Sequence, residues 1–258
     1  MRDVRRMPLK GTHMSTVSKI ALITGANKGI GFEIARQLGA QGITLLAGVR
    51  DQARGATAVQ QLRAEGIDAT AIHLDVTNQA TIDAAAAWID QTYGKLDILV
   101  NNAGISTREG STPPSELALE ALRETFATNV FGVFAVTKAM LPLLRRSEAG
   151  RIVNLSSEMG SLGITSDPTS FAAHLPPTLA YNASKTALNA LTVFFAKELR
   201  DTPIKVNSVS PGYVATDLNG YSGYLTPEQG AKVPVAFATL PVDGPTGGFF
   251  GQQGVIAW

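Results

Sequence analysis

Tyr181 and Lys185 are the two side chains whose types and spacing suit proton transfer. They stand four positions apart, at the start of a stretch with helical periodicity. Residues four apart on a helix share one face, one turn from each other. A free phenol titrates at about pH 10, and a neighbouring ammonium favours the phenolate and lowers that pKa. We therefore expect Tyr181 to exchange protons near neutral pH, tuned by Lys185.

Polar side chains near the predicted strand ends are candidate partners for this pair. Ser156 and Ser157 follow one predicted strand, where a hydroxyl is able to hold a substrate oxygen beside Tyr181. Asn129 lies within a long predicted helix. Its amide has two interpretations that do not exclude each other, a helix-capping or kink-stabilising group and a member of the catalytic set.

A glycine-rich segment, 24–31, follows the first predicted strand and opens a helix. Glycine permits a tight turn and lets the backbone approach a pyrophosphate, which binds at the positive helix N-terminus. The spacing is neither G-x-G-x-x-G nor a P-loop, because Lys28 is followed by glycine instead of Ser or Thr. A plain structural turn is the alternative. The strand and helix on either side favour a dinucleotide site.

The end of the second predicted strand indicates which dinucleotide binds. NAD sites place an acid there for the ribose 2′-hydroxyl, whereas NADP sites carry a cation for the 2′-phosphate. Val49 stands near the acid's place, Arg50 follows it, and Lys28 adds a second cation. Both suit phosphate. The alternatives are that both are solvated surface charges, or that Asp51 pairs with Arg50 or binds a 2′-hydroxyl. NADP(H) is favoured.

Strand-length apolar runs alternate with helix-length stretches, and this order would position the residues above. Predicted strands are 20–24, 43–49, 69–74, 96–100, 151–155, 205–209 and 254–258; predicted helices are 31–38, 56–65, 80–93, 114–144, 180–199 and a short one near 226–229. The 114–144 helix has two candidate bends, at Gly132 and Pro142. Such βαβ units predict a single-domain α/β fold, a Rossmann-type doubly wound parallel β-sheet flanked by helices on both faces. All carboxyl ends of the strands then meet along one edge.

The chain divides into a short extension and one domain. Residues 1–17 are expected to be disordered or vector-derived, with Met14 as an alternative start, and 18–258 form the domain. Two loop-rich segments follow strand ends: 158–179 is interpreted as an inserted loop and 219–246 as a substrate-covering loop and helix.

Bulk composition excludes several classes of function. The 258 residues are 45% hydrophobic and carry a net charge of +1, which gives no electrostatic reason to expect nucleic acid or an anionic membrane as a partner. There is no cysteine, so disulfides and thiolate chemistry are excluded. No apolar run reaches the roughly 18 residues of a membrane span, and the N-terminus has no secretory signal pattern. A cytoplasmic location and no metal are expected.

In this order and context, the motifs resemble the classical short-chain dehydrogenase/reductase family, and most of all its NADP-dependent carbonyl reductases. The resemblance covers about residues 18–258. The matching pieces are the loop 24–31, Asp75-Val76, Asn101 to Gly104, Asn129, Ser157, Tyr181 with Lys185, and Pro211-Gly212.

The resemblance implies catalytic roles. Tyr181 would be the general acid in reduction and the base in oxidation. Lys185 would hold the nicotinamide ribose and tune Tyr181. Ser157, in preference to Ser156, would orient the substrate. Asn129 would bind backbone and a water that links Lys185 to bulk solvent.

The resemblance also implies a cofactor site at the strand ends. Asp75 and Val76 would flank the adenine, Asn102 the adenosine-side ribose, and Val214 and Thr216 the nicotinamide carboxamide and phosphates. The expected NADP(H)-binding set is Gly25, Asn27, Lys28, Gly29, Ile30, Gly31, Arg50, Asp75, Val76, Asn102, Ala103, Gly104, Tyr181, Lys185, Pro211, Gly212, Val214 and Thr216.

The leading hypothesis is NADPH-dependent reduction of a small, apolar ketone, aldehyde or quinone, with Tyr181 as proton donor. Apolar residues expected to line the substrate pocket are Ile105, Met159, Leu179, Tyr213, Tyr221, Tyr224, Leu225, Val233 and Phe237. The alternatives are a catalytically silent NADP(H)-binding sensor or scaffold, an NAD-preferring alcohol dehydrogenase, and a dehydratase or epimerase that regenerates its cofactor.

One departure from the family pattern concerns assembly. Ser157 and Tyr181 are 24 positions apart, which is longer than in most family members. Monomeric carbonyl reductases carry a larger insertion here, covering a helix face that other members use for association. The intermediate length leaves both a homo-oligomer and a monomer open.

Overall fold

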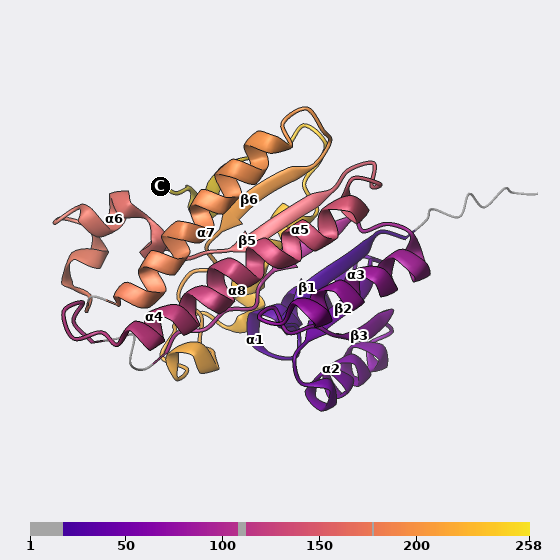
Figure 1. Cartoon of the computed structure of the whole chain (residues 1–258), viewed down its shortest axis with the longest axis horizontal. Coiled ribbons are helices and arrows are strands. Elements are labelled where there is room, and N and C mark those ends of the chain that lie inside the picture. Colours follow the sequence, from indigo (N-terminus) through magenta and orange to yellow (C-terminus); the bar gives the residue numbers. More distant parts are fainter. Residues whose placement is uncertain (1–17, 108–111, 177) are drawn as a thin grey trace, which may run out of the picture.

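Eight strands form one sheet in the order β3-β2-β1-β4-β5-β6-β7-β8. The structure is a computed structural model and describes residues 18–107, 112–176 and 178–258, so the predicted extension 1–17 lies outside the described residues. The strands are β1 (Ile20–Thr24), β2 (Thr44–Val49), β3 (Ala69–His73), β4 (Ile98–Asn101), β5 (Arg151–Leu155), β6 (Lys205–Val209), β7 (Phe249–Gly251) and β8 (Gly254–Val255) (Figure 1). Strands β1 to β7 pair in parallel, and β8 pairs antiparallel with β7.

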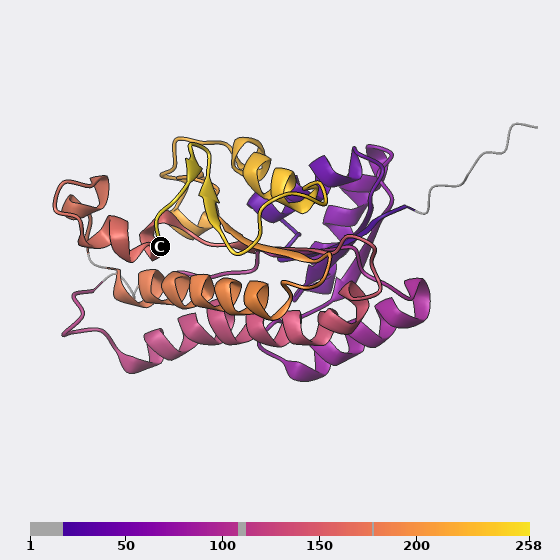
Figure 2. The same ribbon diagram turned by 90° about the horizontal axis from the view of Figure 1, so that it is seen from above.

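Helices cover both faces of the sheet (Figure 2). On one face, α1 (Gly29–Gly39), α2 (Gln52–Ala64) and α8 (Pro227–Ala238) bury their apolar side chains in one core cluster. On the other face, α3 (Gln79–Tyr93), α5 (Val133–Leu144) and α7 (Leu179–Glu198) contribute to a second cluster. The central strands β1, β2, β4 and β5 are buried along their whole length, as a parallel sheet between two helix layers requires. The predicted single-domain α/β fold is confirmed.

The long predicted helix is continuous but irregular. It begins as α4 (Leu119–Phe126), passes through the π-helical segment η2 (Ala127–Gly132) and continues as α5. Gly132, one of the two expected bend positions, packs so tightly that an added Cβ would lie 2.8 Å from Val76 O. Single π-helical turns occur often at functional sites, and η2 carries Asn129.

The continuous helix Leu119–Leu144 is long and apolar enough to cross a membrane by length and composition. It is the one helix of the described residues that passes this test, and 56% of its most apolar window is buried inside the protein. It packs against α3 and α7. The hydropathy of this helix therefore reflects its place in a core layer.

The C-terminal part of the chain differs from the sequence predictions in three elements. β7 was not predicted, because its three residues stand among glycines and show no usable periodicity. The predicted strand 254–258 shrinks to β8, whose antiparallel pairing departs from a fully parallel sheet. The helix expected near 226–229 extends to Ala238, and its partly buried Val233 and Phe237 pack against the core.

The inserted segment 158–179 contains short helices of its own. These are η3 (Glu158–Gly160), α6 (Leu162–Ser166) and η4 (Phe171–His174). The C-terminus holds them in place, because Gly163 N donates to Trp258 O at 2.9 Å. The Trp258 ring in turn stacks on Phe249, with centroids 5.7 Å apart.

Candidate active site

Tyr181 and Lys185 lie in the first turns of α7, at the sheet edge where the carboxyl ends of the parallel strands meet. Lys185 is only 5% exposed, and its Nζ lies 5.5 Å from the centroid of the Tyr181 ring. Its ammonium donates to Leu155 O, the last carbonyl of β5, at 2.8 Å. The predicted juxtaposition of phenol and ammonium is thus present, with β5 holding the lysine.

The structure separates the two candidate serines. Ser157 lies near enough to Tyr181 to lower the pKa of its phenol, and its Oγ accepts from Met159 N at 3.2 Å. Ser156 is 3% exposed, and its Oγ is buried without a hydrogen-bond partner among the described residues. Ser157 is therefore the hydroxyl that shares a site with Tyr181.

Burial dominates the electrostatics of the pair. It raises the pKa of Tyr181, and Ser157 opposes that rise. Burial lowers the pKa of Lys185 to about 8. Removing Tyr181 and Lys185 from water disfavours the charged form of each, the phenolate and the ammonium. The protein alone therefore does not produce the expected lowering of the Tyr181 pKa.

The lowered pKa of Lys185 predicts a pH-dependent stability. Between about pH 8 and pH 10.5 the unfolded chain holds a proton that the folded protein has released, so the free energy of unfolding rises with pH. The slope contributed by one group is at most about 1.4 kcal/mol per pH unit. Urea unfolding at pH 7.5, 8.5 and 9.5 should show this gain in the wild type and lose it in Lys185→Met. The matched variant Lys197→Met, at an exposed position of the same helix, should keep it.

Equal slopes for the wild type and Lys185→Met would contradict this prediction. The pH range of the measurement stops below pH 10. Above that pH the raised pKa of Tyr181 makes the free energy of unfolding fall with pH, which opposes the effect of Lys185.

Asn129 connects two elements of the site. It is fully buried; its Oδ1 accepts from Ile105 N at 2.8 Å, and its Nδ2 donates to Ile105 O at 2.9 Å. Nδ2 also donates to Ser184 Oγ at 3.0 Å, and that hydroxyl donates to Tyr181 O at 2.7 Å. A Cβ added at Gly104 would lie 3.3 Å from Asn129 Oδ1 and 3.5 Å from Lys185 Nζ. Asn129 thus ties the segment after β4 to the first turn of α7.

The glycine loop forms a cradle for an anion. Gly25 and Gly29 have φ of 68° and 56°, the left-handed region that glycine tolerates. A Cβ added at Gly31 would lie 2.4 Å from Asn102 Nδ2 and 2.5 Å from Gly25 O. α1 begins without a side-chain cap at Lys28, so no side chain occupies its N-terminal N–H groups. These residues fit the pyrophosphate of a dinucleotide.

Asn102 supports the loop from the next strand. Its Nδ2 donates to Thr24 O at 2.8 Å and to Gly25 O at 3.2 Å. Thr24 Oγ1 accepts from the backbone N–H groups of Asn102 and Ala103, both at 3.0 Å. The amide nitrogen expected near the adenosine-side ribose is thus already used to shape the glycine loop.

The cationic residues lie at the expected end of the sheet, with partners that were not predicted. Asp51 caps α2 through Arg54 N at 3.1 Å and pairs with the Arg54 side chain at 3.4 Å. The structure therefore pairs Asp51 with Arg54 and not with Arg50. Arg50 is exposed directly after β2. Lys28 forms an ion pair with Asp217.

The remaining predicted cofactor residues also follow strand ends. Asp75 Oδ1 accepts from Thr77 N at 2.9 Å, which closes a turn after β3, and Val76 is buried against η2. After β6, Gly212 has a φ of 83°. A Cβ added at Gly29 would lie 3.6 Å from Thr216 Cγ2. Of the others, Asn27 and Pro211 are half-buried, Ile30 packs against the core and Val214 is buried.

A close contact that sequence reasoning missed fixes the turn containing Ser157. A Cβ added at Gly160 would lie 2.7 Å from Lys185 Cβ and 2.8 Å from Lys185 C. Gly160 O accepts from Thr186 Oγ1 at 2.9 Å and from Asn189 Nδ2 at 3.3 Å. The turn after β5 therefore sits directly on the backbone of α7.

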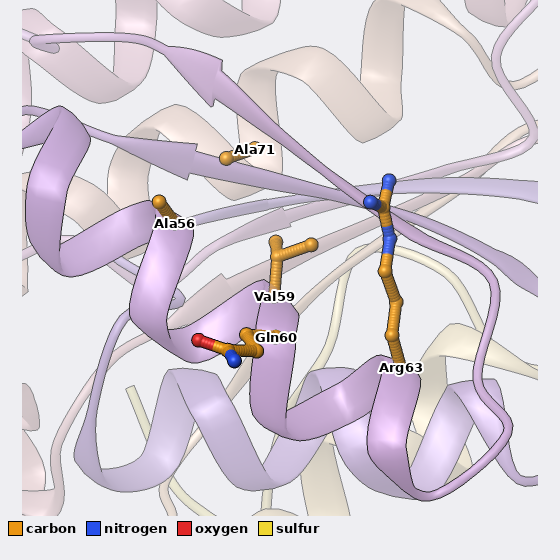
Figure 3. A pocket seen from close by; sticks show the side chains of 5 residues that line it. All are labelled: Ala56, Val59, Gln60, Arg63 and Ala71. Carbon is orange, nitrogen blue, oxygen red and sulfur yellow. The ribbon is translucent and has the colours of Figure 1, made fainter.

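A hollow at the outer edge of the sheet lies far from this chemistry. It is bordered by Ala56, Val59, Gln60, Arg63 and Ala71, between α2 and the edge strand β3 (Figure 3). Its one titratable lining group is Arg63, whose Nε donates to Ala69 O at 2.8 Å. Nothing in this lining suggests catalysis.

The sequence comparisons agree with the fold and the site. Residues 19–223 match the short chain dehydrogenase family. Carbonyl reductase (NADPH) 1 of Bos taurus is 35% identical, over 95% of this chain and 100% of that protein. Salutaridine reductase of Papaver bracteatum is 34% identical, over 95% of this chain and 97% of that protein. The chain belongs to the short-chain dehydrogenase family and is an oxidoreductase of that family.

Solved structures with a similar fold include two reductases. NADPH-bound carbonyl reductase from chicken fatty liver superposes with a TM-score of 0.82 at 28% identity, over 93% of this chain and 99% of that one. Salutaridine reductase from Papaver somniferum gives a TM-score of 0.78 at 32% identity, over 91% and 99%.

Proposed function

We propose that this protein is an NADPH-dependent reductase of small, apolar ketones, aldehydes or quinones. The observation that carries the proposal is the cluster of Ser157, Tyr181 and Lys185: the serine opposes the rise in the pKa of Tyr181, and the buried Nζ of Lys185 lies 5.5 Å from the tyrosine ring. These three groups together bind, orient and protonate a carbonyl oxygen.

In this proposal the protein supplies orientation and the proton. NADPH, when bound, supplies the hydride to the carbonyl carbon. Ser157 Oγ holds the carbonyl oxygen by a hydrogen bond, and Tyr181 transfers its hydroxyl proton to that oxygen. The ammonium of Lys185 stabilises the phenolate left on Tyr181, which regains a proton from solvent. Asn129 keeps the segment after β4 and the first turn of α7 in register.

Preference for NADP(H) is supported by the charges at the strand ends and by the relatives. Lys28 and Arg50 follow β1 and β2, and no carboxylate stands at Val49, where an NAD site places one. The Bos taurus relative is named for NADPH, and the chicken structure contains it. We assign Lys28 and Arg50 to the 2′-phosphate, and the glycine loop to the pyrophosphate.

An apolar substrate is supported by the side chains around Tyr181. Leu179, two positions before Tyr181, is 38% exposed, and Tyr213 is 48% exposed in the segment after β6. The inserted segment adds exposed Leu162 and Phe171. We propose that the inserted segment and segment 213–246 after β6 border the substrate.

Initial-rate measurements with NADPH and with NADH over a panel of ketones, aldehydes and quinones test the proposal. We expect oxidation of NADPH with at least one apolar carbonyl compound, and a lower kcat/KM with NADH. Binding of NADPH without any turnover would indicate a sensor or scaffold. Conversion of a substrate without net loss of NADPH would indicate a dehydratase or epimerase, and a preference for NADH an NAD-dependent alcohol dehydrogenase.

A further inference from the structure

An ion pair joins the glycine loop to a segment that is remote in sequence. Lys28 contacts Asp217, the first residue of η5 (Asp217–Asn219), across 189 positions. The hydroxyl of Tyr221 donates to the other carboxylate oxygen of Asp217. Two groups therefore hold this carboxylate directly over the loop that begins α1.

The charges around Asp217 are mainly positive. The pKa of Asp217 is lowered by Lys28 first, then by the hydroxyl of Tyr221, with a smaller contribution from Arg54. Lys28 follows β1, and Arg54 lies in the first turn of α2, after β2. One carboxylate thus faces cations from the two segments where the 2′-phosphate of the cofactor is expected.

The backbone supports this contact. A Cβ added at Gly29 would lie 3.6 Å from Thr216 Cγ2, so the two segments approach each other at the residues next to the ion pair. Tyr221 has a φ of 62°, which is strained for a non-glycine residue, and its N–H donates to Thr216 O at 2.9 Å. The turn 216–221 thus presents both the carboxylate and the hydroxyl toward Lys28.

We propose that Asp217 is a specificity-determining residue for the cofactor, because its carboxylate competes with the 2′-phosphate for Lys28. The inference rests on the proposed role of Lys28. A phosphate monoester carries nearly two charges and three acceptor oxygens, so it displaces a carboxylate from an exposed lysine. The Lys28–Asp217 pair is lost in the exchange, so the free energy of that pair is subtracted from the affinity for NADPH. NADH has no 2′-phosphate and leaves the pair intact.

Dissociation constants of NADPH and NADH, measured by tryptophan fluorescence on the full chain, test this inference. In Asp217→Asn the Kd of NADPH should fall about twofold to fivefold and that of NADH should not change. Asparagine keeps an acceptor for Tyr221, so the turn is preserved. Lys28→Met should raise the Kd of NADPH about tenfold. In the double variant the effect of Asp217→Asn should disappear.

The control is Asp201→Asn, which removes an exposed carboxylate that pairs with Arg200 after α7. It should change neither constant. The effect of Asp217→Asn should also shrink between 50 and 300 mM salt, because the groups are exposed. An equal change for both cofactors, or an effect that persists in the double variant, would overturn the inference.

Failure of the inference and failure of the proposed function give different results. An unchanged NADPH affinity in Lys28→Met refutes the role of Lys28 and the inference with it. If the Kd values shift as expected but no carbonyl compound is turned over, the reductase function is refuted and the role of Asp217 stands.

Discussion

Tyr181→Phe is expected to lower kcat with NADPH by about 10²-fold to 10⁴-fold. The substitution removes the hydroxyl that would protonate the carbonyl oxygen and keeps the ring near Lys185 Nζ. Because the phenyl ring still fills its place on α7, the Kd of NADPH should change less than about twofold. Stopped-flow single turnover and fluorescence titration measure the two quantities separately.

The matched control for this prediction is Tyr93→Phe. Tyr93 is also a partly buried tyrosine, but it packs edge-to-face on Trp88 at the end of α3, away from the site. Its variant should keep wild-type kcat. If the Tyr181→Phe variant oxidises NADPH at the wild-type rate, Tyr181 is not the proton donor, whatever the stability of the variant.

Gly160→Ala is expected to lower kcat by about 10-fold to 100-fold, through a side chain that touches no substrate. The new methyl would meet the Cβ and backbone carbon of Lys185, and a helix backbone cannot yield as a flexible side chain does. The turn must then move away from α7 and carry Ser157 away from Tyr181. A misplacement of about 1 Å in a catalytic group can cost about 10²-fold in rate. Overpacking should also lower the free energy of unfolding by about 1–3 kcal/mol.

Gly150→Ala separates positioning from stability. Gly150 directly precedes β5, whereas Gly160 lies in the turn that follows this strand. A Cβ added at Gly150 would lie 2.9 Å from Ile204 Cγ1. Both variants should lose stability, as urea unfolding will show, but only Gly160→Ala should lose kcat. KM is expected to change less than kcat in Gly160→Ala, because Ser157 acts on the reacting oxygen. A kcat loss of the same size in both variants would reduce the Gly160 contact to a packing role.

Much of the site followed from local sequence. The phenol, the ammonium and Ser157 carry their chemistry in their residue types, and the strand pattern placed them at one edge of the sheet. The glycine loop was recognisable for the same reason, since its neighbours in sequence are also its neighbours in space. Ser184, three positions after Tyr181 on the same helix, could have been found from spacing alone.

The contacts that refine the site are long-range, and local sequence carries no sign of them. Asp217 is 189 positions from Lys28, and Asn129 reaches Ile105 and Ser184 from a π-helical turn that no propensity predicts. The direction of the Tyr181 pKa shift also depended on burial, which outweighs the opposing effect of Ser157. Desolvation is a property of everything packed around a group.

The sequence by itself determined the strands β1 to β6, the alternation of strands with helices and the residues at the carboxyl edge of the sheet, because periodicity and glycine placement are local properties. Only the tertiary structure decided which carboxylate holds Lys28, and that α8 and the three-residue β7 pack into the core. Those outcomes depend on close packing between segments far apart in the chain, where a contact of a few ångströms is set by the whole fold.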